Sequence, residues 1–319
     1  MTNPHILVVR LGAMGDIIHA LPAVASLKNS FPGARITWVV EPRWAPLLEA
    51  NPFVDRATPL RRGTARGILA SWREIRSERY DFAVDFQGLI KSAVTAACAR
   101  PGRIFGYHRS QAREAASALF YSDEVRSASE HVVDRNLDLA AAAGATAALR
   151  VFPLPPGAPE GELPQGDFVL ASPLAGWRRK QWPLAYYAAL AARLRAELGM
   201  ALVLNGPESA AGELAQVAGA ALHFSGLPGL IDATRRAAAV VGVDSGPMHL
   251  AAALGKPGVA IFGPTDPARN GPYSSKMRVL RSPSAVTTYK RSEEIDPSMC
   301  DISADEVFEC LQAALERRP

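Results

Sequence analysis

The chain has 319 residues, of which 48% are hydrophobic and 21% charged, and its net charge is +4. A chain of this length is too long to fold around a single hydrophobic core and is long enough for two domains, each with enough apolar residues to bury an interior. Three cysteines form neither a metal-like pair nor a disulfide framework, which favours a reducing compartment. No stretch of about 20 uninterrupted apolar residues predicts a membrane span, and the N-terminus does not resemble a signal peptide. We therefore expect a cytoplasmic protein whose membrane contact, if any, is peripheral.

In the first half, short β-like runs alternate with helical stretches. The predicted strands are Ile6–Val9, Arg35–Val40, Phe82–Asp85 and Ile104–Tyr107, and the predicted helices are Ile17–Asn29, Thr64–Ser77, Leu89–Cys98 and Glu130–Ala143. Strands that alternate with helices indicate parallel βαβ units.

A Pro- and Gly-rich stretch, 153–166, is interpreted as a linker between an N-terminal domain (1–152) and a second βα series (167–302). The predicted strands there are Phe168–Ser172, Ala201–Leu204, His223–Phe224, Val240–Val243 and Gly258–Phe262, and the predicted helices are Ala185–Glu197, Ala210–Val217, Leu230–Ala237 and Pro247–Leu254. A capping-box spacing at Ser303–Glu306 predicts a final helix to about Leu315. The fold class is α/β, with two Rossmann-like doubly wound domains facing an interdomain cleft, a layout that suits the joining of two substrates.

The positive charge is concentrated in the first half. Residues 56–113 carry 12 basic and 4 acidic side chains, a net +8. Such a patch attracts phosphates, anionic lipid or nucleic acid, although a solvated face is the simpler interpretation.

The first predicted strand ends in a turn bracketed by Gly12 and Gly15, with Asp16 at the expected start of a helix. Ligands of open α/β sheets bind at the carboxyl ends of the strands, so Asp16 is placed where chemistry occurs. Alternatively, Asp16 is only the N-cap of the helix that begins at Ile17.

In the second half, strand Val240–Val243 leads into Asp244, Ser245 and Gly246. Free amides at a helix N-terminus bind phosphate, but a plain helix cap fits the same residues. His249, on that helix, either faces the cleft or is simply packed.

Three successive cations, Arg178, Arg179 and Lys180, follow strand Phe168–Ser172. Their mutual repulsion would be relieved by a diphosphate, although an exposed basic loop is the commoner outcome. Glu208, after another strand, either accepts hydrogen bonds from sugar hydroxyls or serves as a helix N-terminal charge.

Several templates are missing from the sequence: a Walker A loop, G-x-G-x-x-G, an Asp-x-Asp triplet and zinc-ligand spacing. A bound diphosphate would therefore be neutralised by Lys180, arginines and helix termini, and no metal or other cofactor is expected.

Taken together, four elements resemble the family 9 glycosyltransferases, the ADP-heptose:lipopolysaccharide heptosyltransferases with a GT-B fold. They are Arg10-Leu-Gly-Ala-Met-Gly15-Asp16-Ile-Ile-His19-Ala-Leu-Pro22, Lys180-Gln-Trp-Pro183, Asp244-Ser-Gly-Pro-Met-His249 and Phe262-Gly-Pro-Thr265-Asp266-Pro. The stretches Asp85–Ala93 and Ala112–Tyr121 look most like the heptosyltransferase I group, which adds the first heptose to Kdo-lipid A. The resemblance also implies a C-terminal crossover helix, 303–319, that packs back toward the N-terminal domain.

The resemblance implies roles for individual residues. Asp16 matches the catalytic base. The positions that match the donor site are Lys180, Glu208, Asp244, Ser245, Gly246 and His249. The positions that match the anionic-acceptor site are Arg10, Arg61, Arg62 and Arg113. The chain departs from relatives by Ser245 in place of Thr, by Ala175-Gly176 in place of hydroxyl residues, and by few cations after Arg62.

We therefore expect a metal-independent, inverting transfer of heptose from an ADP-heptose donor to the acidic sugar Kdo of Kdo-lipid A, on the cytoplasmic face of the inner membrane. The alternatives are a family 9 transferase with another nucleotide-sugar or acceptor, and a non-catalytic nucleotide-sugar-binding protein. Nucleic acid is not an expected partner, because the basic patch lacks an interleaved aromatic platform.

Overall fold

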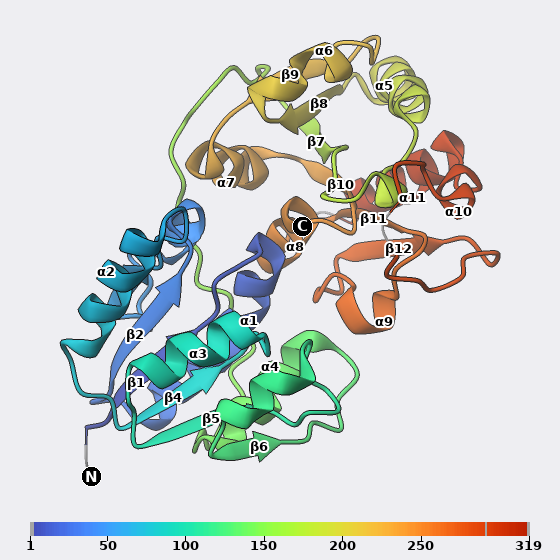
Figure 1. Ribbon diagram of the computed structural model, residues 1–319. Coiled ribbons are helices and arrows are strands. Elements are labelled where there is room, and N and C mark those ends of the chain that lie inside the picture. Colours follow the sequence, from blue (N-terminus) through green and yellow to red (C-terminus); the bar gives the residue numbers. More distant parts are fainter. Residues whose placement is uncertain (1–2, 291, 318–319) are drawn as a thin grey trace. The chain divides into compact units, whose positions relative to one another are not determined.

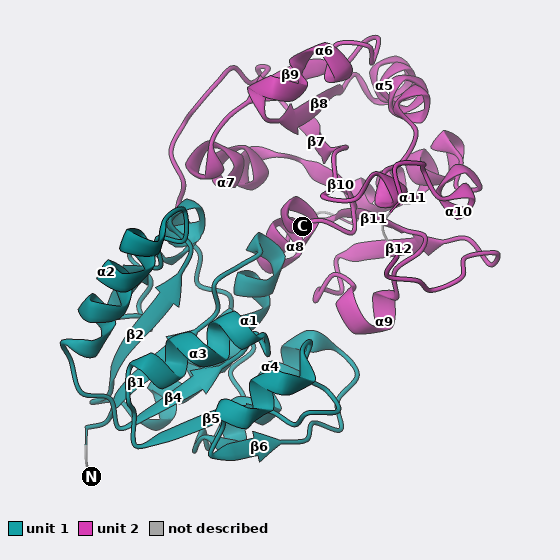
Figure 2. Ribbon diagram, viewed as in Figure 1, with its two compact units in different colours: residues 1–155 teal, residues 156–319 magenta. Residues whose placement is uncertain are grey.

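The computed structural model describes residues 3–290 and 292–317. The chain divides into two compact units, residues 1–155 and 156–319 (Figure 2). The division lies inside the stretch 153–166 that the sequence marks as a linker. The later part of that stretch packs on the second unit, because the Glu160 carboxylate accepts the Gly226 N–H at 2.7 Å.

The first unit is built around a sheet of six parallel strands in the order β3-β2-β1-β4-β5-β6 (Figure 1). Its strands are β1 (His5–Val9), β2 (Arg35–Val40), β3 (Arg56–Pro59), β4 (Phe82–Asp85), β5 (Arg103–Tyr107) and β6 (Asp123–Val125). Its helices are α1 (Met14–Ser30), the 3₁₀ helix η1 (Pro42–Leu48), α2 (Ala65–Arg76), α3 (Ile90–Cys98), the 3₁₀ helix η2 (Ala115–Phe120) and α4 (Val132–Ala142).

The helices of the first unit form two layers. α1 packs against α4, and α3 packs against both α2 and η2. Since crossovers between parallel strands are right-handed, α1 and the α2–α3 pair cover opposite faces of the sheet. Strands are added to one edge of the sheet from β1 to β3 and to the other edge from β4 to β6, so the strand order reverses between the neighbours β1 and β4. This is the position where doubly wound sheets bind ligands.

The second unit repeats this architecture with strand order β12-β11-β10-β7-β8-β9, again all parallel. Its strands are β7 (Phe168–Ser172), β8 (Ala201–Gly206), β9 (Ala221–Phe224), β10 (Ala239–Val243), β11 (Gly258–Phe262) and β12 (Met277–Arg281). Its helices are η3 (Arg178–Lys180), α5 (Leu184–Leu198), η4 (Glu208–Ala210), α6 (Ala211–Leu214), α7 (Leu227–Arg236), α8 (Gly246–Ala253), α9 (Pro267–Asn270), α10 (Pro297–Cys300) and α11 (Ala304–Glu316). Here the strand order reverses between the neighbours β7 and β10.

The C-terminal helix α11 is capped as predicted and packs on the second unit. Ser303 accepts the Glu306 N–H at 3.1 Å, as the capping-box spacing predicts. The buried face of α11, which includes Val307, Phe308 and Leu311, belongs to the core of the second unit and packs against α5 and β11. The apolar stripe of α11 is therefore buried within its own unit, and its packing toward the first unit stays a prediction.

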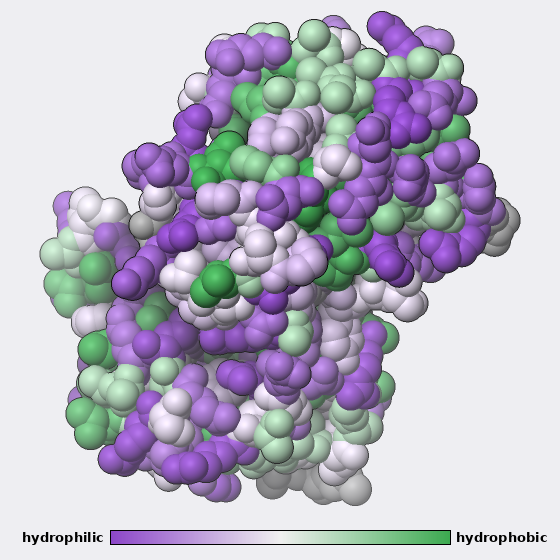
Figure 3. Space-filling model, turned by 90° about the vertical axis from the view of Figure 1, so that its right-hand side faces the viewer, coloured by the Kyte–Doolittle hydropathy of each residue, from purple (hydrophilic) through white to green (hydrophobic). Residues whose placement is uncertain are grey.

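None of the helices in the described part of the chain is long and apolar enough to cross a membrane. On the face drawn in Figure 3, hydrophobic residues are interspersed among hydrophilic ones.

Candidate functional site

The carboxylate of Asp16 lies in the first turn of α1, directly beyond the carboxyl end of β1. α1 begins at Met14 with Ala13 as its N-cap, so Asp16 is the third residue of the helix and not its N-cap. Its Oδ2 accepts the Ala13 N–H at 3.2 Å. The interpretation of Asp16 as the N-cap is therefore wrong in position, although its carboxylate does accept a backbone amide at the helix start.

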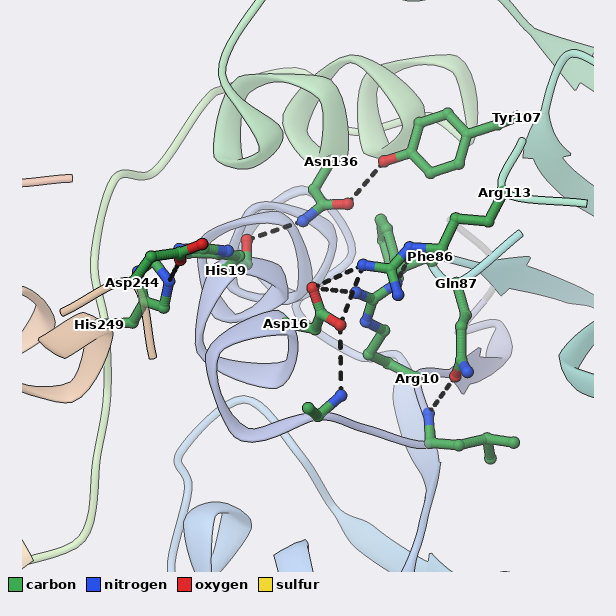
Figure 4. A network of polar contacts seen from close by, with 12 residues as sticks. Arg10, Asp16, His19, Phe86, Gln87, Tyr107, Arg113, Asn136, Asp244 and His249 are labelled. Atoms are coloured by element: carbon green, nitrogen blue, oxygen red, sulfur yellow. Dashed lines mark hydrogen bonds and ion pairs between the residues drawn. The ribbon is translucent and has the colours of Figure 1, made fainter. Parts of the chain in front are cut away.

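Two arginines bind the same carboxylate (Figure 4). Nη2 of Arg10 lies 2.6 Å from Oδ1 of Asp16, and Nη2 of Arg113 lies 2.9 Å from Oδ1 and 3.0 Å from Oδ2. Burial alone would raise the pKa of this carboxyl, but the two guanidinium groups outweigh it and lower the pKa of Asp16 to about 2. Asp16 is thus an ionised carboxylate, and one fifth of its side chain stays exposed.

The two arginines differ in exposure. Arg10 is 3% exposed, and its Nη1 donates to the Phe86 carbonyl at 2.5 Å, so it is fixed beneath the site. The Arg113 side chain is 46% exposed and comes from the loop between β5 and η2. Only Arg113 is free to meet a ligand from solvent, so its predicted role in binding an acceptor fits the structure better than that of Arg10.

The neighbouring strand β4 supports the site through hydrogen bonds that the sequence did not predict. Asp85 is fully buried and accepts from Gln87 N, the Ser92 hydroxyl and the Tyr121 hydroxyl, the last two at 2.8 Å. Burial raises the pKa of Asp85, and these hydrogen bonds partly offset that rise. Gln87 in turn accepts the Leu11 N–H at 2.7 Å, which ties the turn after β4 to the turn after β1 (Figure 4).

The other side of α1 is tied to α4 and β5. Asn136 donates to the His19 carbonyl at 2.9 Å and accepts from the Tyr107 hydroxyl at 2.6 Å (Figure 4). These buried contacts hold the first turns of α1, and with them Asp16, in one place.

Arg61 and Arg62 do not contact Asp16 in the described residues. They line a cavity of about 670 Å³ together with Glu41, Arg43 and Lys91. Arg62 forms an ion pair with Glu41, and Arg61 lies 3.8 Å from Glu74. Lys91 was not predicted as a site residue; burial and the nearby Arg62 charge lower its pKa.

In the second unit, Lys180 and His249 bind one buried carboxylate. Nζ of Lys180 lies 3.0 Å from Oδ2 of Asp244, and Nε2 of His249 lies 3.6 Å from Oδ1. Burial alone would raise the pKa of Asp244, but His249 and Lys180 hold it well below its ordinary range. Lys180 follows β7 and Asp244 follows β10, so this cluster forms where the strand order of the second sheet reverses.

The three successive cations each have a carboxylate partner inside the protein. Arg178 lies 3.9 Å from Glu213, Arg179 donates to Asp296 at 2.7 Å, and Lys180 pairs with Asp244. Carboxylates distant in sequence therefore offset the repulsion within the triplet, and a bound diphosphate near Lys180 stays a prediction.

The start of α8 has the features of an anion site. Ser245 is its N-cap, Gly246 is its first residue, and no side chain caps its first amides. The Ser245 hydroxyl is buried and has no hydrogen-bond partner among the described residues. The same holds for the Thr265 hydroxyl just beyond β11, which the sequence analysis quoted in a motif without giving it a role.

Glu208 lies apart from this cluster as an exposed residue of η4. It forms no ion pair with Lys180 or His249 in the described part of the chain.

Residues 3–290 and 292–317 contain no group of three His, Cys, Asp or Glu side chains that could hold a metal ion.

Comparison with known proteins gives consistent matches over most of the chain. The model of glycosyltransferase family 9 (heptosyltransferase) matches residues 68–297. Lipopolysaccharide heptosyltransferase 1 of Pseudomonas aeruginosa is 31% identical, covering 94% of this chain and 92% of the relative.

Solved structures agree with the sequence matches. The E. coli heptosyltransferase WaaC with ADP is 26% identical, with a TM-score of 0.78 over 97% of this chain and 99% of that chain. WaaC with ADP-2-deoxy-2-fluoro heptose is 25% identical, with a TM-score of 0.76 over 97% of this chain and 99% of that chain. The chain therefore belongs to glycosyltransferase family 9, the heptosyltransferase family.

Proposed function

We propose that this protein transfers heptose from ADP-heptose to the acidic sugar Kdo of a lipid A acceptor during synthesis of the lipopolysaccharide inner core. Family membership, the 31% identity to a lipopolysaccharide heptosyltransferase 1, and the likeness to WaaC structures with ADP and a fluorinated ADP-heptose support the donor. The chemistry of the acceptor is inferred from the arginines of the first unit.

The second unit supplies the donor contacts in this proposal. The uncapped amides of α8 and the unpartnered Ser245 hydroxyl offer hydrogen bonds to a diphosphate, and Lys180 adds a positive charge beside them. Asp244 and His249 remain beside the diphosphate as hydrogen-bond partners for sugar hydroxyls. Glu208 is the least supported of the proposed donor residues, since it lies outside this cluster.

One observation carries the proposed mechanism: Asp16 is ionised, partly exposed and fixed at the carboxyl end of β1. Its carboxylate takes the proton of an acceptor hydroxyl while that oxygen bonds to the anomeric carbon of the donor. The bond between that carbon and the diphosphate breaks on the opposite face, so ADP leaves and the configuration is inverted. One base and one stabilised leaving group suffice for this single displacement.

Arg113 adjusts the strength of this base. While Arg113 binds both Asp16 oxygens, the carboxylate is a weak base, since its pKa is about 2. A carboxylate or phosphate on the acceptor competes for the exposed Arg113 guanidinium, which frees one Asp16 oxygen to accept a proton. Binding of an anionic acceptor thus activates its own base.

We further propose that no divalent cation is required, because Lys180 and the α8 amides stabilise the charge that develops on ADP. Arg61 and Arg62 hold acceptor phosphates in the cavity beside Lys91, and the enzyme works at the cytoplasmic face of the inner membrane as a peripheral protein. Its basic first unit favours an anionic lipid surface.

The test is to incubate the purified protein with ADP-heptose and Kdo₂-lipid A in the presence of EDTA. We expect a mass gain of one heptose and, by NMR, an inverted anomeric configuration. ADP-glucose replaces the donor as control. Loss of transfer on EDTA treatment, restored by Mg²⁺, would contradict metal independence, and transfer only from another nucleotide-sugar would contradict the donor.

A further inference from the structure

Two cavities of the first unit adjoin along a shared wall made of Leu60, Arg62 and Lys91. The first is the cationic cavity of about 670 Å³, which also contains Arg43 and Arg61. The second is a groove of about 410 Å³ between α2 and α3. Together they form one depression that is cationic at one end and apolar at the other.

The walls of the α2–α3 groove are mainly apolar side chains that are only partly buried. Ile68 and Trp72 come from α2, and Ile90 and Val94 come from α3. Ile68, Trp72 and Val94 are half-buried, and Ile90 is 44% exposed. The core-facing positions of α2 are instead Ser71 and Ile75. The groove is therefore an apolar surface left over after the core is filled, of a size typical for small-molecule sites.

The charged side chains of the depression favour an anionic ligand at its cationic end. The Glu114 carboxylate accepts the Ile90 N–H at 2.7 Å and so caps α3. The cationic cavity is lined by four cations and one carboxylate. The carboxylate, Glu41, pairs with Arg43 and Arg62. A ligand that fits the whole depression is an amphiphile, with an anionic head and an apolar tail.

We propose that the α2–α3 groove receives an acyl chain of the anionic lipid acceptor, while Arg62 and Lys91 bind a phosphate at the junction of head and chain. The inference rests on the proposed function, because it extends the same acceptor site. Each methylene group that the groove takes from water contributes about 0.8 kcal/mol, or about fourfold in Kd. The lipid is thus recognised by its chain as well as by its charge.

The kinetic test compares Kdo₂-lipid A with its deacylated form, both dispersed at the same detergent concentration. For the wild-type protein we expect a KM at least about tenfold lower for the acylated acceptor. Ile68→Gln, which places an amide in the groove, raises KM for the acylated acceptor alone. Val94→Trp, which fills the groove without adding a polar group, does the same.

The matched control is Leu69→Gln. Leu69 is the next residue of α2 and is 50% exposed, but it does not line the groove, so its replacement leaves both KM values unchanged. An equal rise in KM for Leu69→Gln and Ile68→Gln would overturn the proposal that the groove binds an acyl chain, and would indicate instead that this face of α2 rests on the membrane. Equal wild-type KM values for both acceptors would also overturn it. In both cases transfer to the deacylated acceptor keeps the proposed function intact, whereas no transfer to either acceptor would refute that function.

Binding without turnover gives an independent readout. Dodecyl phosphate brominated in its chain, used below its critical micelle concentration, quenches the fluorescence of Trp72 on contact in the groove. Trp72→Phe removes that quenching, and inorganic phosphate causes none. Quenching of equal size in Trp72→Phe would place the chain elsewhere and overturn the proposal.

Discussion

The Arg113 guanidinium spans both carboxylate oxygens of Asp16, at 2.9 and 3.0 Å, although the two residues are 97 positions apart in the chain. The contact joins a loop beyond β5 to the first turn of α1. It makes the ionisation of Asp16 depend on an exposed side chain that an anionic ligand can displace. The chemistry of the first unit therefore depends on this pair and not on Asp16 alone.

Asp16→Glu separates catalysis from folding more cleanly than Asp16→Asn. The asparagine removes the charge that faces buried Arg10, and leaving one member of a buried pair uncompensated costs about 3–5 kcal/mol. Glutamate keeps the charge but moves the carboxylate by about the length of one bond. We expect turnover to fall about 10²-fold or more, since such displacements are costly in catalysis. The measurement is kcat beside thermal unfolding; turnover near that of the wild type would refute the assignment of the base.

Arg113→Ala acts on the acceptor rather than on the donor. We expect KM for the acceptor to rise by about tenfold, while the Kd for ADP, measured by calorimetry, stays unchanged. Loss of Arg113 also removes a cause of the low Asp16 pKa, so that pKa rises. Arg109→Ala is the matched control, because Arg109 is an exposed arginine of the same loop that pairs with Glu124. A change in ADP affinity would contradict the division of roles.

Acid lowers stability through Asp16. Its folded pKa of about 2 lies below the ordinary value of 3.8, so ionised Asp16 stabilises the fold above about pH 4. That stabilisation, about 2 kcal/mol, is lost as the pH falls from 4 toward 2. Denaturant unfolding at several pH values measures it. Asp16→Asn, whatever its absolute stability, shows a flatter dependence over this window, and an equal slope would contradict the low pKa.

Lys180→Gln tests the donor cluster. Lys180 is half-buried and pairs with Asp244, and its Nζ lies 5.0 Å from the centre of the Trp177 ring. We expect the Kd for ADP to rise about 10–100-fold, since a charge-assisted contact contributes about 1.5–3 kcal/mol. Arg178→Gln is the control, because Arg178 belongs to the same triplet but pairs only loosely with exposed Glu213. Equal effects of the two variants on ADP affinity would show that net charge, and not the position of Lys180, matters.

Ser245→Ala is expected to weaken ligand binding without weakening the fold. Its hydroxyl is buried and unpartnered among the described residues, so its removal costs the unliganded protein little and can stabilise it. The Kd for ADP should rise about tenfold. Thr265→Val tests the hydroxyl beyond β11 in the same way, with the same expected result. Destabilisation of the free protein by either change, with ADP affinity intact, would mean that these hydroxyls have a structural role.

The sequence predicted the central strands because each is a continuous apolar run bounded by turn residues. β2, β4, β7 and β11 have the predicted bounds. The edge strands β3, β6 and β12 were missed. Arg56–Pro59 and Asp123–Val125 are short, and half or more of their residues are polar or charged. Their pairing depends on the neighbouring strand, which local sequence does not encode.

The candidate site was predictable only in its backbone. The glycine-rich turns placed Asp16 and Asp244 at strand ends, because that position follows from the local pattern. Their partners did not follow from it, since Arg113 and Lys180 reach them from elements far away in the sequence. The same limit explains why the carboxylates that neutralise Arg178 and Arg179 were not foreseen.

Asp85, the last residue of β4, and Asp16, in the first turn of the helix that follows β1, respond differently to ionic strength. The hydrogen-bond partners of Asp85 described above are neutral, and the carboxylate is fully buried, so dissolved salt scarcely affects it. The Asp16–Arg113 pair reaches solvent through an arginine that is 46% exposed, and salt screens it. Rising salt therefore loosens Arg113 from the carboxylate while the turn that holds Gln87 stays in place.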